Sequence, residues 1–85
     1  MRENLTLTVL EILRREKANG RPNVQRADIL GELKTQQGIV LDRRQVGAVM
    51  QNLRRRGYVI ETEVNYRTRE ANYELLSEPR GDEDE

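Results

Sequence analysis

The chain has 85 residues, with 15 basic and 15 acidic side chains, 35% apolar residues and neither histidine nor cysteine. A chain of this length forms one domain with a small core, because it buries only about 60–65% of the surface that its unfolded state exposes. Disulfide bonds and zinc sites built from Cys and His are excluded, and the commonest catalytic base and the commonest strong nucleophile are missing. We therefore expect a protein that is not an enzyme and that holds no metal or cofactor.

The net charge of zero hides an uneven distribution along the chain. Residues 78–85 hold five acids and one base, whereas the other 77 residues hold 14 bases and 10 acids. This indicates an ordered domain over 1–77 followed by an acidic, disordered tail over 78–85. A membrane span needs about 20 apolar residues, and a signal peptide needs an apolar stretch of about 7–15. Every apolar run in this chain is shorter than either. A cytoplasmic protein without membrane contact is therefore predicted.

Two helices are predicted in the first half of the chain. Apolar residues recur at helical spacing from Leu5 to Leu13, which indicates an amphipathic helix of about four turns that Asn19-Gly20 ends. A second helix is expected over 26–37, ended by Gly38. Its main apolar row is expected to be Ala27, Leu30 and Leu33, with Ile29 beside it.

The third helix has the clearest signals. Asp42 supplies an N-cap oxygen, Gln45 follows three residues later in a capping-box arrangement, and Gly57 ends the helix. The positions expected to face the core recur at helical spacing, and they are Val46, Val49, Met50 and Leu53. A helix over 42–56 is therefore predicted.

After Gly57 the apolar spacing changes to alternation. Residues 58–64 and 71–75 are predicted to be two half-buried strands, with Tyr58 and Tyr73 facing inward. The polar segment 65–70 joins them into a β-hairpin. The segment Asn23–Gln25 is a candidate third strand. The predicted fold class is α+β, with three helices followed by a hairpin.

This order of elements resembles the winged helix-turn-helix superfamily, over about residues 5–77. The segment GIVLDRRQVG at 38–47 resembles the turn and the start of the recognition helix in bacterial and archaeal repressors. The segment LRRRGYVI at 53–60 resembles the end of that helix entering the first strand of the wing. The resemblance implies a DNA-binding protein of the prokaryotic or viral transcription-regulator type, although members that bind RNA or only proteins share the fold.

The side of the third helix opposite its apolar row suits the major groove of DNA. Arginine can donate two hydrogen bonds to guanine, glutamine can pair with adenine, and alanine can contact the thymine methyl group. Residues 43–56 hold five arginines and no acid, whereas a merely solvated helix face ordinarily mixes Glu and Lys. The residues expected to face DNA are Arg44, Ala48, Gln51 and Arg55, with Gly47 and Asn52 at the margins.

Further arginines are expected to contact phosphates, which position a protein on DNA without reading its sequence. Arg43, Arg54 and Arg56 flank the reading row, although Arg54 and Arg56 also stabilise the negative end of the helix dipole. Arg67 and Arg69 in the hairpin turn suit the DNA backbone or a narrow minor groove, or belong to a turn that is polar because it is exposed.

Two groups of residues leave alternatives open. The glutamates of the hairpin would repel phosphates unless they point away, and they are Glu61, Glu63, Glu70 and Glu74. Arg21 and Arg26 flank the entry to the second helix and are either phosphate ligands or part of an ordinary exposed loop.

The sequence predicts sequence-specific binding of double-stranded DNA by a transcription regulator, cytoplasmic and nucleoid-associated when bound. Helix 42–56 is expected in the major groove, with hairpin 58–76 as the wing. A protein-interaction winged helix without DNA binding and an excisionase-like or replication accessory factor stay open as alternatives. A monomer and a homodimer both stay open. The acidic tail is inert, competes with DNA, or binds a basic protein partner.

Overall fold

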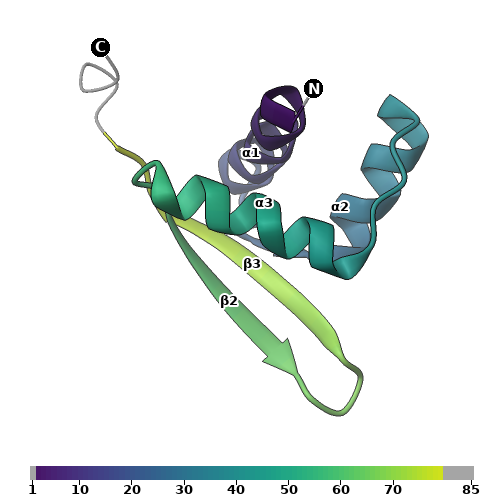
Figure 1. Ribbon diagram of the computed structural model, residues 1–85. Coiled ribbons are helices and arrows are strands. Elements are labelled where there is room, and N and C mark those ends of the chain that lie inside the picture. Colours follow the sequence, from purple (N-terminus) through teal and green to yellow (C-terminus); the bar gives the residue numbers. More distant parts are fainter. Residues whose placement is uncertain (1, 80–85) are drawn as a thin grey trace.

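The structure, a computed structural model, describes residues 2–79, with side chains from Leu5 onward. Its fold class is α+β, as predicted, with three helices and a three-stranded antiparallel sheet that ends in a hairpin (Figure 1). None of the described helices is both long enough and apolar enough to cross a membrane. The elements in chain order are α1 (Arg2–Ala18), β1 (Asn23–Gln25), α2 (Arg26–Glu32), the π-helix η1 (Leu33–Gln37), α3 (Arg43–Arg55), β2 (Val59–Asn65) and β3 (Glu70–Ser77).

Helix α1 buries the side that its apolar spacing predicted. Val9 is fully buried and Leu13 is 1% exposed, and Thr6 on the same side is also buried. Gly20 adopts a positive φ of 81° just after the helix. A left-handed residue after the last turn is a common helix end. The predicted helix and its end at Asn19-Gly20 are therefore confirmed.

Helix α2 buries a different row from the predicted one. Ile29 and Leu33 are completely buried, Leu30 is half-buried and Ala27 is exposed. The expected row was wrong in including Ala27, because residues four apart, such as Ile29 and Leu33, share a helix face while Ala27 lies on another. The π-helix η1 continues α2 to Gln37, and no local pattern predicted the change from α-helix to π-helix. Gly38 ends η1 in the left-handed conformation, as predicted.

Strand β3 is the centre of the sheet, whose order is β1-β3-β2. Tyr73 of β3 pairs with Val24 of β1 on one side and with Thr62 of β2 on the other. The candidate strand at Asn23–Gln25 is therefore confirmed. Alternation along β3 also holds, because the residues that face the helices are buried, and they are Ala71, Tyr73 and Leu75.

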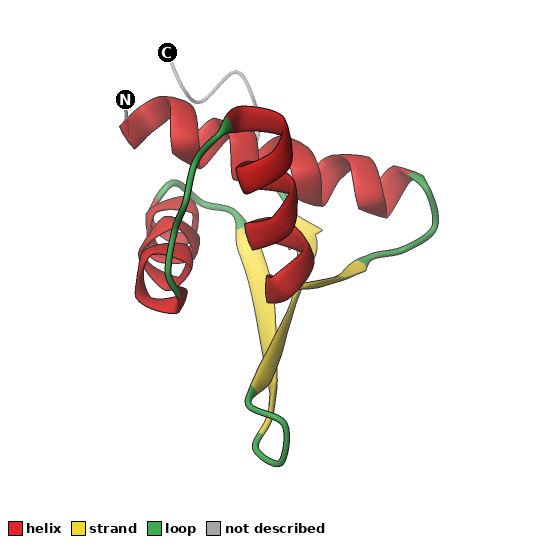
Figure 2. Cartoon of the chain, turned by 90° about the vertical axis from the view of Figure 1, so that its right-hand side faces the viewer, coloured by secondary structure: helices red, strands yellow, loops and turns green. Residues whose placement is uncertain are grey.

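The β2–β3 hairpin projects away from the helices (Figure 2). Ile60 at its base is buried, but Thr62 and Val64, which share the inward phase of β2, are exposed. The prediction of a half-buried strand is wrong beyond Ile60, because the helices cover only the base of the hairpin. Tyr58 is half-buried rather than fully inward, with the Arg14 guanidinium 6.0 Å from its ring centroid.

The end of the described chain is held by the domain. Arg14 Nη2 donates a hydrogen bond to Glu78 Oε1 at 2.6 Å. Pro79 lies against Gly57, where an added Cβ would come within 3.1 Å of Pro79 Cβ. Gly57 has a φ of 100°, a conformation that strains other residues. The predicted tail over 78–85 therefore begins with two residues that contact the domain, while residues 80–85 lie outside the described part of the chain.

Candidate nucleic-acid interface

Helix α3 begins and ends where predicted. Asp42 Oδ1 accepts a hydrogen bond from Gln45 N at 2.9 Å, and Gln45 Oε1 accepts one from Asp42 N at 2.9 Å, so the capping box is complete. The residues of the predicted apolar row are buried, and they are Val46, Val49, Met50 and Leu53. This buried row fixes the rotation of the helix and leaves its opposite side to solvent.

The solvent side of α3 carries the residues predicted to face DNA. Arg44 and Arg55 are exposed, and neither forms an ion pair with a carboxylate among the described side chains. The row thus offers guanidinium donors that are free of acidic partners within the described part of the chain. The uncharged members of the predicted set also reach the surface, Ala48, Gln51 and Asn52 being exposed and Gly47 half-buried.

One flank of α3 borders α1. Ala48 and Asn52 line a groove of about 350 Å³ there, together with Leu5 and Thr6 of α1. Two residues predicted to approach DNA, both exposed, therefore also border the N-terminal part of α1.

The other flank of α3 borders the hairpin through Arg54. Its Nε and Nη2 donate to Ile60 O at 3.1 and 2.9 Å, and Nη2 also donates to Thr62 Oγ1 at 2.6 Å. These bonds join the last turn of α3 to β2. Part of the guanidinium that was predicted to contact a phosphate is therefore engaged within the protein, and its contact with DNA stays a prediction.

The hairpin turn is stiffened by its own hydrogen bonds. Asn65 Oδ1 accepts from Arg67 N at 2.9 Å, and Asn65 O accepts from Arg69 N at 2.7 Å. Arg69 has a φ of 64°, in the left-handed region that few residues other than glycine adopt. Arg67 and Arg69 are exposed, and Tyr66 beside them is 88% exposed. The turn therefore presents these side chains on a preorganised backbone, which lowers the entropy cost of binding.

Arg26 connects the start of α2 to this turn. Its Nη2 donates to Arg69 O at 2.8 Å, between residues 43 positions apart in the sequence. Arg26, Arg43 and Arg69 line one pocket, so the structure brings together two predicted site residues and one that sequence reasoning left open. No local pattern could have signalled this contact, because it depends on how the hairpin packs beside α2.

Most of the glutamates of the hairpin lie on the sheet face that points away from the helices. Glu61 pairs with Glu74, and Glu63 pairs with Asn72. These positions alternate with the buried residues of β3, so their side chains leave the opposite face of the sheet. Glu70 differs, since it borders the pocket described above. A partner lying along α3 would therefore meet few of these carboxylates.

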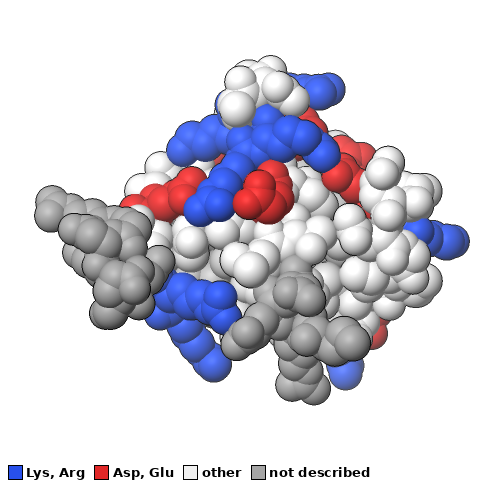
Figure 3. Space-filling view, turned by 90° about the horizontal axis from the view of Figure 1, so that it is seen from above, with Lys and Arg blue, Asp and Glu red and all other residues white. Residues whose placement is uncertain are grey.

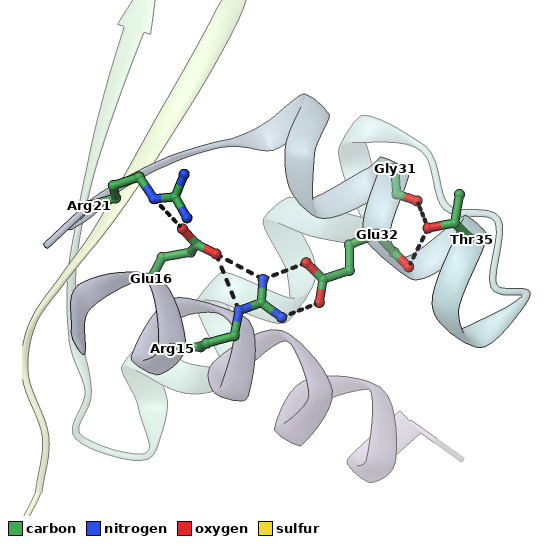
Figure 4. Close-up of polar contacts among 6 residues, drawn as sticks. All are labelled: Arg15, Glu16, Arg21, Gly31, Glu32 and Thr35. Carbon is green, nitrogen blue, oxygen red and sulfur yellow. Dashed lines mark hydrogen bonds and ion pairs between the residues drawn. The ribbon is translucent and has the colours of Figure 1, made fainter. Parts of the chain in front are cut away.

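Arginines near the C-terminal end of α1 are paired with acids. Arg15 Nη2 lies 2.6 Å from Glu32 Oε1 and 2.9 Å from Glu16 Oε2, and Arg21 Nε lies 3.2 Å from Glu16 Oε1 (Figure 4). The hydrogen bonds from Arg15 hold the pKa of the Glu32 carboxyl below its ordinary range. Figure 3 shows one group of basic side chains with acidic side chains beside it on the face seen from above, and separate basic side chains near the edges of that face. The charges of Arg15 and Arg21 are thus largely neutralised by ion pairs within the protein.

No family model, curated protein or solved structure matches the chain. Chemically, the solvent side of α3 and the hairpin turn offer guanidinium and amide hydrogen-bond donors. Within the described residues there is no group of three or more metal-ligating side chains of the Asp, Glu, His or Cys type. The arrangement is therefore suited to holding an anionic partner by hydrogen bonds and charge.

Proposed function

We propose that this protein is a winged-helix protein that binds double-stranded DNA in a sequence-specific way and regulates transcription. One observation carries the proposal: some arginines form ion pairs with glutamates, whereas others form none with a described carboxylate. Arg14, Arg15 and Arg21 form ion pairs with glutamates. The arginines without an ion pair to a described carboxylate include Arg43, Arg44, Arg55, Arg67 and Arg69. These arginines are exposed on α3 and at the hairpin turn. Clustered positive charge that the protein does not neutralise is the electrostatic signature of nucleic-acid binding.

In this proposal α3 enters the major groove with its solvent side toward the base edges. Arg44 and Arg55 are about three turns apart along the helix. Both can reach bases only when α3 lies along the groove rather than end-on. Gly47 has no side chain and Ala48 has only a methyl group, which allows α3 to approach the base edges closely. Gln51 then stands between the two arginines, where its amide can pair with adenine.

The β2–β3 hairpin is the wing in this proposal. Its turn carries Arg67 and Arg69, whose side chains are exposed, and the backbone of Arg69 is bonded to Arg26 at the start of α2. An arginine entering a narrow minor groove is favoured by the enhanced negative potential there. The placement of Glu61 and Glu63 on the opposite face of the sheet lowers the repulsion that would otherwise weaken such a contact.

Fluorescence anisotropy with a short labelled duplex of random sequence, measured across a salt series, tests the proposal. We expect the logarithm of the association constant to fall linearly with the logarithm of salt, with a slope of about −0.9 per phosphate neutralised. A preferred site is then selected from a random pool. On that site Arg44→Ala and Arg55→Ala should each lose about 1–3 kcal/mol of binding free energy and relax the preference at one base.

Arg21→Ala is the matched control, because it removes the same charge from the side whose arginines are paired. We expect it to change duplex affinity little. Absence of duplex binding by the wild-type protein at low salt would overturn the proposal. Equal losses in Arg21→Ala and Arg55→Ala would do the same, since they would show no preference for the α3 side.

A further inference from the structure

A pocket of about 190 Å³ lies where α2, α3 and the hairpin meet. Three arginines line it, Arg26 from the start of α2, Arg43 from the first turn of α3 and Arg69 from the hairpin turn. Leu30 and Ala71 form apolar parts of its wall. Three separate elements thus each place one arginine residue along the lining of this small space.

A hydrogen bond joins two of the three arginines. Arg26 Nη2 donates to Arg69 O at 2.8 Å, which ties the start of α2 to the hairpin turn. That bond uses one of the five N–H donors of a guanidinium. Arg43 has no intramolecular hydrogen bond or ion pair from its side chain among the described residues. Most of the N–H donors of these arginine side chains therefore have no intramolecular partner among the described residues.

The pocket is not neutralised by the described part of the chain. Glu70 is the one acid among its described lining residues, and none of the three arginines forms an ion pair with it or with another described carboxylate. Like charges gathered in one place repel one another, at about 1 kcal/mol for a pair 4 Å apart even in water. An anion with several acceptor oxygens would attract all three guanidinium groups and offset this repulsion. The planar guanidinium group matches phosphate oxygens well.

We propose that this pocket binds one phosphodiester group of the DNA backbone, and that this single contact fixes the hairpin and α3 in register on the duplex. The inference rests on the proposed function, because it requires that the protein binds double-stranded DNA. Arg43 and Arg44 are consecutive, so a phosphate held by Arg43 lies beside the bases that Arg44 is proposed to reach. Phosphate contacts of this kind set the register of a protein without reading sequence.

The chemistry of the pocket is tested first without DNA. Inorganic phosphate is titrated into the full-length protein, and the backbone and arginine Nε–H signals are followed by NMR against sodium chloride of matched ionic strength. We expect saturable shifts at Arg26, Arg43 and Arg69 and smaller, non-saturating shifts at Arg15 and Arg21. Shifts that match the chloride control, or that are equal at all five arginines, would contradict the proposal that phosphate binds in this pocket.

The assignment to DNA is tested with the duplex titration. Arg43→Ala is the informative variant, because its side chain has no described intramolecular partner and its loss should leave the fold intact, as thermal unfolding would check. We expect its salt slope to be shallower by about 0.9, the value for one lost phosphate contact. Arg26→Ala should show the same change, and Arg21→Ala should show none.

The outcomes separate this inference from the proposed function. Duplex binding by the wild-type protein with an unchanged slope in Arg43→Ala and Arg26→Ala would overturn the pocket alone. Saturable binding of inorganic phosphate without duplex binding would overturn both the proposed function and the assignment to DNA, and would indicate a free phosphate or phosphate ester as the ligand.

Discussion

Two pockets flank the start of α2, and arginines line both of them. In the pocket between α1, β1 and α2, Arg15 and Arg21 share the lining with three acids, Glu16, Asp28 and Glu32. Ion pairs to Glu16 and Glu32 engage both of these arginines. In the pocket between α2, α3 and the hairpin, three arginines meet one acid, Glu70, and no ion pair forms among the described side chains.

Side-chain partners, not positions in the sequence, separate structural arginines from those available to a ligand. Arg54 and Arg55 are neighbours, yet Arg54 donates three hydrogen bonds to β2 while Arg55 has no ion pair to a described carboxylate. Exposed ion pairs such as those of Arg15 contribute only about 0.2–1 kcal/mol each. Their main effect on this protein is to neutralise one side of it.

The comparison is tested most strongly by the neighbouring pair Arg54 and Arg55. Arg54→Ala should lower the free energy of unfolding by about 1–2 kcal/mol, since hydrogen bonds from a charged donor are worth about 1.5–3 kcal/mol and these are partly exposed. Arg55→Ala should stay within about 0.5 kcal/mol of the wild type, as a surface substitution usually does. Urea denaturation measures both, and equal destabilisation would contradict the division between them.

The next largest effect is expected at the N-cap of α3. Asp42→Ala removes the acceptor for Gln45 N and should cost about 0.5–2 kcal/mol of stability. Asp42→Asn keeps an acceptor oxygen while removing a negative charge next to Arg43. We expect its stability to be close to that of the wild type and its duplex affinity to be slightly higher. Thermal unfolding and the duplex titration check the two variants, and lower affinity in Asp42→Asn would count against a phosphate near this turn.

A smaller, pH-dependent effect is expected on the side whose arginines are paired. The pKa of Glu32 is lowered in the folded state by Arg15, so its contribution to stability is complete above the unfolded carboxyl pKa and is lost as pH falls through the lower, folded pKa. Glu32→Gln should therefore cost about 0.2–1 kcal/mol at pH 7 and progressively less below about pH 4.5.

The control for this pair is Glu63→Gln, whose carboxylate forms no ion pair with a described cation. Urea denaturation between neutral and acidic pH compares the two variants with the wild type. A Glu32→Gln difference that grows on acidification would have the wrong sign for a carboxylate whose pKa is lowered. The duplex affinity of Glu32→Gln should stay nearly unchanged, because Glu32 lines the pocket between α1, β1 and α2 and not the surface that is proposed to contact DNA.

The smallest effect is expected from removing residues 80–85, which leaves the bond from Arg14 to Glu78 in place. The removed segment holds four acids and one arginine, and it follows Pro79, which lies against Gly57 near the end of α3. Duplex affinity should rise by a few-fold at low salt and less at high salt, since exposed charges interact by about 1 kcal/mol or less and are screened. Unchanged affinity at low and moderate salt would discard competition between this segment and DNA.

Local sequence signals predicted α3 more completely than any other element. The capping box at Asp42, the buried row and the stop at Gly57 all depend on residues within one or two turns of one another, so they are encoded locally. The exposure of Arg44 and Arg55 follows directly from the same periodicity. The buried row of α2 was less predictable, because packing against the rest of the core decided that Ile29 rather than Ala27 is covered.

The α+β class, the order of the elements and the side of α3 that faces solvent could be predicted from the sequence alone, and the strand at Asn23–Gln25 was a candidate there. Periodicity and end signals suffice for these, because they reflect the conformation of short segments. The tertiary structure decided which arginines are neutralised, that Arg54 joins β2, and that Arg26, Arg43 and Arg69 share a pocket. Side-chain partners of this kind lie far apart along the chain, and they meet only when the elements pack.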